Sequence, residues 1–202
     1  MAVFALVSLL IAAAPVKVLP GDESSKDKSF AAFKKDLEGA VKRKDAAAVR
    51  AVLDEKVQAG FGAGEGVGEF LKALPLEASS PLWSTLATVL GKGCAKSGKS
   101  EFVCPYLFAK APEAFDWFEH SVLTKAVPLR AGPAEGAKVV ATRSHEVVKG
   151  VRTHEEAWVK IETLDGVIGH VPHALLDSPL DTRVFFKKGK AGWKLTFLGA
   201  GD

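Results

Sequence analysis

The chain has 202 residues, a length that allows one large domain or two small ones. Its 27 Lys and Arg residues against 24 Asp and Glu residues leave a formal net charge of +3 at pH 7. This near balance argues against a dedicated nucleic-acid binder, which would carry a strong basic patch with interleaved aromatic side chains.

The first fourteen residues are uncharged and, apart from Ser8, apolar, and the first basic residue is Lys17. Such a stretch is too short to cross a bilayer, which needs about 20 residues. It is typical of a secretory signal peptide over residues 1–14, with the alanines at 12–14 as a small-residue cleavage site. The alternative is a buried N-terminal strand or helix. We therefore expect a periplasmic or secreted protein without a stable membrane anchor after cleavage.

Residues 20–28 are polar and lack periodic apolar side chains, which predicts a disordered linker over residues 15–28. A helical region over residues 29–118 follows. Its first helix is indicated by four apolar side chains at helical spacing, Phe30, Phe33, Leu37 and Val41. Asp45 is placed to cap the N-terminus of a second helix.

The clearest helix start lies further along this region. Ser80 is placed to cap the helix, and Pro81 stands at the first helical position. We expect Gly91 to end this helix from a left-handed conformation.

A glycine-rich segment over residues 61–68 separates two of the predicted helices. A phosphate-binding loop would need a buried strand before it and a helix starting at the phosphate. The preceding segment, residues 55–60, is too short and too polar for a buried strand, and no Gly-Lys-Ser/Thr ending is present. The segment is therefore interpreted as a flexible turn and not as a nucleotide site.

The only cysteines are Cys94 and Cys104. In an exported protein such an isolated pair indicates one disulfide, whereas in the cytosol it would be two buried thiols. Two cysteines without a nearby histidine make only half of a metal site. The aromatic cluster formed by Phe115, Trp117 and Phe118 is expected to bury the seam between the two halves of the chain; a ligand box is the alternative.

Short β-rich runs separated by Gly, Pro and Asp-Gly follow, a pattern typical of a small all-β barrel. Residues 138–141 and 146–148 are predicted strands. In the strand from Trp158 to Thr163, alternation puts Val159 and Ile161 on the core face and Trp158 near the outer surface. Asp165-Gly166 is predicted to be the hairpin turn after it.

This order of residues resembles the bacterial SH3 (SH3b) domain. The resemblance rests on the arm Val127-Pro128-Leu129-Arg130-Ala131-Gly132-Pro133 and on the hairpin Trp158-Val159-Lys160-Ile161, Asp165-Gly166 and Gly169-His170-Val171. It implies a barrel over residues 119–177. The resemblance implies a binding fold and no catalysed reaction. Relatives of this fold are associated with binding cell-wall peptide or glycan.

The same resemblance implies a shallow ligand groove with Trp158, Arg130, Lys160 and His170 as candidate binding residues. Trp158 and Arg130 stand at matching positions, whereas His170 replaces a residue that is commonly aromatic in the family. An indole offers a flat contact for a sugar or peptide, and a guanidinium can fork onto a carboxylate. Alternatively, Trp158 only covers one end of the barrel.

The helical half also resembles the region before SH3b domains in some exported bacterial proteins of unassigned function. The matching residues are Phe33-Leu37, Asp45-Val49, Pro81-Leu82-Trp83 and Pro105-Tyr106-Leu107-Phe108. This resemblance carries no activity with it.

Residues 178–202 contain two more strand patterns around a Gly- and Lys-rich turn. An isolated hairpin is marginal in water, so we expect this C-terminal hairpin to pack back on the helical region. The barrel would then be an insertion within a larger α+β body. The last strand also resembles that of ketosteroid-isomerase-like cones, but the long strands of such a cone are missing from the helical half.

The five histidines are the remaining candidates for chemistry. His170 and His173 flank Val-Pro and could clip a metal, but a structural substitution is the simpler account. His145 and His154 are expected in solvated loops. His120 with either cysteine is the only nucleophile–base pairing available for a cysteine hydrolase.

The sequence as a whole predicts an α+β protein that is not an enzyme: no catalytic residues, no metal and no cofactor are expected. Its predicted function is recognition of peptidoglycan or an envelope protein by the barrel. The alternatives are a structural or protein-interaction protein without cell-wall affinity and, after that, a cell-wall hydrolase accessory or an enzyme.

Overall fold

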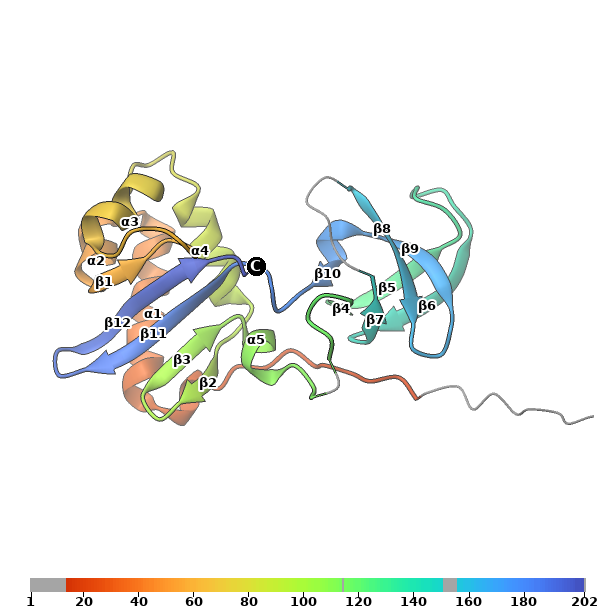
Figure 1. Cartoon of the computed structure of the whole chain (residues 1–202), viewed down its shortest axis with the longest axis horizontal. Coiled ribbons are helices and arrows are strands. Elements are labelled where there is room, and N and C mark those ends of the chain that lie inside the picture. Colours follow the sequence, from red (N-terminus) through yellow and green to blue (C-terminus); the bar gives the residue numbers. More distant parts are fainter. Residues whose placement is uncertain (1–13, 114, 151–155, 202) are drawn as a thin grey trace, which may run out of the picture. The chain divides into compact units, whose positions relative to one another are not determined.

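The computed structural model describes residues 14–113, 115–150 and 156–201. These residues form two compact units (Figure 1). The small unit comprises Glu119–Leu176 and the described residues up to Lys17. The large unit comprises Val18–Phe118 and the chain from Asp177 onward, so residues 119–176 of the small unit lie between its two stretches of sequence.

The large unit combines helices with a five-stranded sheet of order β1-β12-β11-β3-β2. Its helices are η1 (Ser24–Lys26), α1 (Lys28–Arg43), α2 (Ala46–Ala51), α3 (Val67–Ala73), α4 (Leu82–Gly91) and α5 (Tyr106–Lys110). Its strands are β1 (Leu53–Gln58), β2 (Ala95–Gly98), β3 (Glu101–Cys104), β11 (Arg183–Gly189) and β12 (Gly192–Gly199). The fold class is α+β, as the sequence predicted. The region expected to be helical nevertheless supplies three strands, two of which form a hairpin in the cysteine-bounded segment.

One predicted helix start is confirmed, because the Asp45 carboxylate accepts a hydrogen bond from the Ala48 amide at 3.0 Å and caps α2. The start of α4 differs from its prediction: Pro81 and not Ser80 is the N-cap residue, and the Ser80 hydroxyl accepts a hydrogen bond from the Leu82 amide at 3.2 Å. The prediction for Gly91 is wrong in its details, because Gly91 is the last helical residue and the left-handed position, with φ of 74°, belongs to Gly93.

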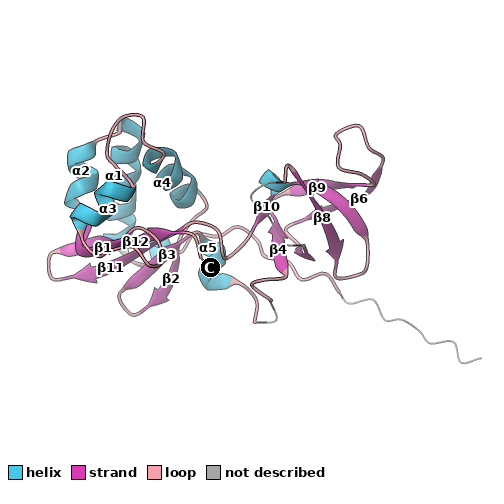
Figure 2. Cartoon of the chain, turned by 45° about the horizontal axis from the view of Figure 1, so that its top comes forward, coloured by secondary structure: helices cyan, strands magenta, loops and turns pink. Residues whose placement is uncertain are grey.

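Figure 2 shows α1, α2, α3 and α4 together on one side of the sheet. The C-terminal hairpin of β11 and β12 packs against them, as expected. Its inward side chains Phe186, Trp193 and Leu195 are at most 6% exposed and share one core with residues of α1 and α4. β12 also pairs in parallel with β1, so β12 is an inner strand of the sheet, between β1 and β11.

The segment predicted to be a disordered linker, residues 15–28, has defined contacts in the structure. The Val147 amide donates a hydrogen bond to the Val16 carbonyl at 2.8 Å in the small unit. In the large unit the Glu23 amide donates to the Cys94 carbonyl at 2.7 Å, and Asp27 caps α1. These contacts are made by the backbone and by capping side chains, which leave no apolar periodicity in a sequence.

The small unit is a seven-stranded sheet of order β10-β4-β7-β8-β9-β5-β6. Its elements are β4 (His120–Leu123), β5 (Ala126–Arg130), β6 (Val139–Ser144), β7 (Val147–Lys149), β8 (Trp158–Thr163), β9 (Ile168–Pro172), η2 (His173–Leu175) and β10 (Leu176–Asp177). Its core is separate from that of the large unit and includes Leu129, Val159 and Ile161.

The predicted signal peptide lies outside the described residues except for residue 14, and His154 is also outside them. Along the rest of the chain, no described helix is long and apolar enough to span a membrane.

The aromatic cluster before β4 is partly exposed. Phe115 is buried, whereas Trp117 is 36% exposed and Phe118 is 66% exposed.

Candidate functional site

Strand pairing brings three of the predicted binding residues into one row. Arg130 on β5 lies opposite His170 on β9, and His170 lies opposite Lys160 on β8. Directly opposite residues of antiparallel strands project from the same face of the sheet. Lys160 is exposed and the other two are half-buried, so the row lies on the outer face, away from the core.

Trp158 belongs to the same face. It lies two residues before Lys160 on β8 and opposite Pro172 on β9, and it is half-buried. The intervening Val159 and Ile161 are 2% and 1% exposed, which confirms the predicted alternation. The structure thus places all four predicted binding residues on one surface, which we call the outer sheet face.

The guanidinium of Arg130 is partly engaged by its own loop. One terminal nitrogen donates to the Ala137 carbonyl at 2.9 Å, and the other lies 3.3 Å from a carboxylate oxygen of the exposed Glu135. These bonds hold the segment between β5 and β6 beside the outer sheet face. Arg130 therefore shapes this surface as well as contributing charge, a role that its sequence position alone did not indicate.

His170 contributes a buried polar atom in the middle of the row. Its Nδ1 atom is inaccessible to solvent and has no hydrogen-bond partner within the described part of the chain. A buried polar atom without a partner costs stability, and because Nδ1 is inaccessible to solvent it offers no contact to a ligand on the outer sheet face.

Three exposed apolar side chains of the small unit were missed by the sequence reasoning. Ile168, Val139 and Val140 are 54%, 45% and 43% exposed. Val139 pairs with Arg130 across a register shift in the β5–β6 ladder, and Ile168 pairs with Glu162. In the sequence the two valines looked like part of an ordinary strand. In the structure they lie at the register shift between β5 and β6, where both are exposed.

The β8–β9 hairpin that carries much of the outer sheet face is braced at its turn. The Thr163 hydroxyl donates a hydrogen bond to Asp165, and the Arg143 guanidinium lies 3.0 Å from the same carboxylate. The hydrogen bond from the Thr163 hydroxyl lowers the pKa of Asp165 most, and the positive charge of Arg143 lowers it further. Asp165 therefore stays ionised and ties the turn to β6.

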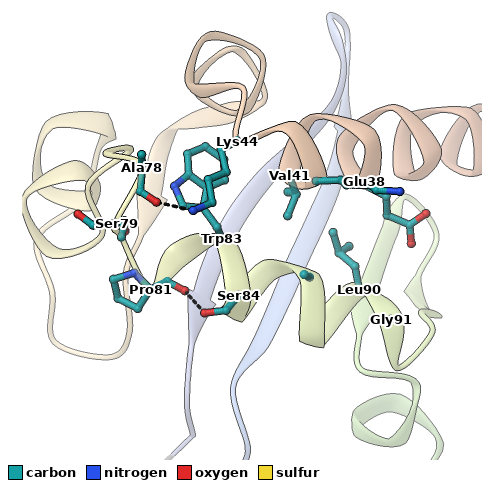
Figure 3. A pocket seen from close by; sticks show the side chains of 13 residues that line it. Glu38, Val41, Lys44, Ala78, Ser79, Pro81, Trp83, Ser84, Leu90 and Gly91 are labelled. Carbon is teal, nitrogen blue, oxygen red and sulfur yellow. Dashed lines mark hydrogen bonds between the residues drawn. The ribbon is translucent and has the colours of Figure 1, made fainter.

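A pocket of about 710 Å³ lies in the large unit between α1, α4 and the segment that precedes α4 (Figure 3). The Lys44 amine donates to the Ala78 carbonyl at 2.6 Å, and the Ser84 hydroxyl donates to the Pro81 carbonyl at 3.0 Å. Trp83 is only 4% exposed, so the apolar floor already belongs to the core. The described lining combines lysine, glutamate and serine side chains with no histidine or cysteine, and it was not predicted.

The cysteines and histidines were the candidates for chemistry. Cys94 and Cys104 form a disulfide that joins the segment after α4 to the end of β3. Neither sulfur is then a free thiol, so the cysteine-hydrolase alternative has no nucleophile. His145, expected in a solvated loop, is half-buried between β6 and β7. Across residues 14–113, 115–150 and 156–201, no group of three or more His, Cys, Asp or Glu side chains is arranged to hold a metal ion.

The comparisons with known proteins agree with the geometry of the small unit. No curated protein and no solved structure matches the chain. Residues 124–178 match the family described as the bacterial SH3 domain. This matched segment spans β5 to β10 and carries the whole outer sheet face. The chain therefore contains a bacterial SH3 domain.

Proposed function

We propose that this protein is a non-enzymatic exported binding protein whose SH3 domain recognises peptidoglycan or an envelope protein through the outer sheet face. The observation that carries the proposal is the row of Lys160, His170 and Arg130 with Trp158 beside it. The SH3 domain and the disulfide together point to an extracellular or periplasmic location.

The chemistry of this face suits peptidoglycan. Its stem peptides carry carboxylates, which a row of cationic and hydrogen-bonding side chains can bind. Its sugars present flat faces that can pack on the partly exposed indole of Trp158. The surface combines a planar contact with cationic groups two residues away, as a ligand with both sugar and peptide parts requires.

A second candidate is protein interaction without cell-wall affinity. The observation that favours it is the exposure of Ile168, Val139 and Val140 on the small unit. Exposed apolar side chains that cluster on one unit are typical of protein-binding surfaces. A sugar polymer would gain little from these aliphatic contacts.

Sedimentation with purified sacculi tests the first candidate. We expect the wild-type protein to sediment with them and Trp158→Ala to bind about tenfold more weakly, because a stacked aromatic side chain dominates such contacts. Lys160→Ala should weaken binding less, by about threefold, since its amine is exposed and screened.

Lys125→Ala is the matched control, because Lys125 is an exposed lysine of the same unit that lies in the turn between β4 and β5. Its binding should equal that of the wild type. Circular dichroism of each variant verifies folding. The cell-wall proposal is abandoned if folded wild-type protein stays in the supernatant, or if all three variants bind equally well.

A further inference from the structure

Two hairpin turns of the large unit come together at one end of its sheet. β2 and β3 are joined by the turn Lys99-Ser100, and β11 and β12 are joined by the turn Lys190-Ala191. β3 pairs with β11 so that Glu101, directly after the first turn, lies opposite Lys187. The two turns therefore lie side by side, and Figure 1 shows both at the same end of the sheet.

Lysine side chains gather around these turns. The Lys188 amine donates a hydrogen bond to the Ser29 hydroxyl at 2.7 Å, which places Lys28, the first residue of α1, at the same end of the sheet. Three separate parts of the chain thus contribute five exposed lysines, which we call the lysine end: Lys28, Lys99, Lys187, Lys188 and Lys190.

Only part of this positive charge is compensated. The Lys187 amine lies 3.5 Å from the Glu101 carboxylate, and the Lys188 amine lies 3.6 Å from the Asp27 carboxylate. The other three lysines form no ion pair with any residue that the structure describes. Five lysines against two carboxylates leave the lysine end with three surplus positive charges.

The neighbouring strands do not offset this surplus. β1 and β12 together carry two positive and two negative side chains, which balance one another: Lys56, Lys194, Asp54 and Glu55. The Lys194 amine is already engaged, since it donates a hydrogen bond to the Ala51 carbonyl at 2.6 Å. The lysine end therefore attracts an anionic partner.

The kind of cation indicates which anionic partner fits. All five cations are lysines, whose compact and strongly hydrated amines act as point charges, whereas a specific phosphate site would use the planar fork of arginine. In addition, no large apolar or aromatic side chain is exposed among the described residues of the two turns or the first turn of α1. A single-stranded nucleic acid would need such rings for base stacking.

Two turns that project side by side suit a flat partner better than a linear one. Clusters of four to eight basic residues bind membranes that carry anionic lipid, where each lysine near the surface contributes about 1 kcal/mol. We propose that the lysine end docks the large unit on a membrane surface rich in anionic phospholipid. The attraction is electrostatic, and no apolar side chain enters the bilayer.

Co-sedimentation of the whole protein with vesicles tests this proposal. We expect binding to vesicles of phosphatidylglycerol and phosphatidylcholine and no binding to vesicles of phosphatidylcholine alone. In about 1 M salt, where the Debye length falls to about 3 Å, binding should be lost. The double variant Lys99→Gln/Lys190→Gln should bind about thirtyfold more weakly than the wild type, because it removes two lysines from the surface contact.

Lys42→Gln/Arg43→Gln is the matched control. It lowers the net charge by the same amount, and both side chains are exposed. They lie in the last turn of α1, about 20 Å along the helix from Lys28, which is about two Debye lengths at 0.1 M salt. The control should therefore bind the anionic vesicles as the wild type does.

Four results would overturn the proposal. They are no binding of the wild type to the anionic vesicles, equal binding to vesicles of phosphatidylcholine alone, equal losses in the two double variants, and tighter binding per phosphate to soluble polyphosphate, which would identify a linear polymer as the partner. Because the substituted side chains are exposed, circular dichroism should show every variant folded. This result does not depend on the sacculus experiment, which tests the other unit.

Discussion

At the scale of single residues, Glu23 shows how a polar segment becomes ordered. Its carboxylate lies 2.7 Å from the Lys26 amine and 3.2 Å from the Lys110 amine, and it accepts a hydrogen bond from the Lys96 amide at 3.1 Å. The bond from Lys26 is the strongest influence, and together these groups lower the pKa of Glu23 from 4.5 to about 2. One side chain thereby links η1, β2 and α5.

This environment predicts a pH dependence of stability. Because the folded-state pKa of Glu23 is depressed, its stabilising contribution is complete above the ordinary value of 4.5 and is lost as the pH falls from 4.5 toward about 2. Glu23→Gln should therefore be less stable than the wild type at neutral pH and equally stable below the folded-state pKa. Urea denaturation of both proteins across this range measures the difference; a constant difference at every pH would contradict the assignment.

At the scale of elements, the C-terminal hairpin is a structural part of the large unit. Trp193 on β12 donates a hydrogen bond from its indole to the Ser29 hydroxyl at 3.0 Å. Its ring lies 4.9 Å from that of Phe30 and 5.5 Å from that of Phe102. The hairpin thus joins the first helix and the β2–β3 hairpin in one aromatic core.

Trp193→Ala should accordingly destabilise the large unit by about 3–5 kcal/mol, because it opens a cavity in this core. Phe118→Ala is the control, since Phe118 is 66% exposed, and its cost should stay below about 1 kcal/mol. Urea midpoints give both values. Equal costs for the two variants would show that the hairpin does not carry the core.

At the scale of the whole molecule, two separate cores serve two units. Leu195 belongs to the core of the large unit and Leu129 to that of the small unit, and both side chains are 0% exposed. Since no core is shared, each unit can unfold as its own cooperative transition.

We expect calorimetry to show two transitions that respond to different substitutions. Leu195→Ala should lower the transition of the large unit by about 2–5 kcal/mol, and Leu129→Ala should lower that of the small unit by a similar amount. Each variant should leave the other transition unchanged. A single transition that shifts in both variants would show that the units fold as one.

Local patterns in the sequence were sufficient for much of this architecture. The Asp45 cap, the alternation of Val159 and Ile161, and the SH3 domain were all read from residues close together in the chain. The shared face of Trp158 and Lys160 follows from strand parity as well. Neighbouring residues decide such features because capping, pleating and turn geometry act over a few positions.

Features that join distant segments could not be read in this way. The parallel pairing of β1 with β12 converted a region that seemed helical into part of a sheet, and the polar segment around Glu23 became ordered by partners far along the chain. The pairing of Arg130 with His170 depends on the register between β5 and β9, which local sequence patterns do not specify.

Short-range spacing and hydrophobic pattern were enough to predict the SH3 domain and the closing hairpin and to make Cys94 and Cys104 candidates for one disulfide. The position of Phe61, which the glycine-rich turn holds against rings from α5, β11 and β12, follows only from the three-dimensional structure. That cluster of rings is assembled from four separate parts of the chain, and long-range packing, which leaves no periodic mark in a sequence, brings them together.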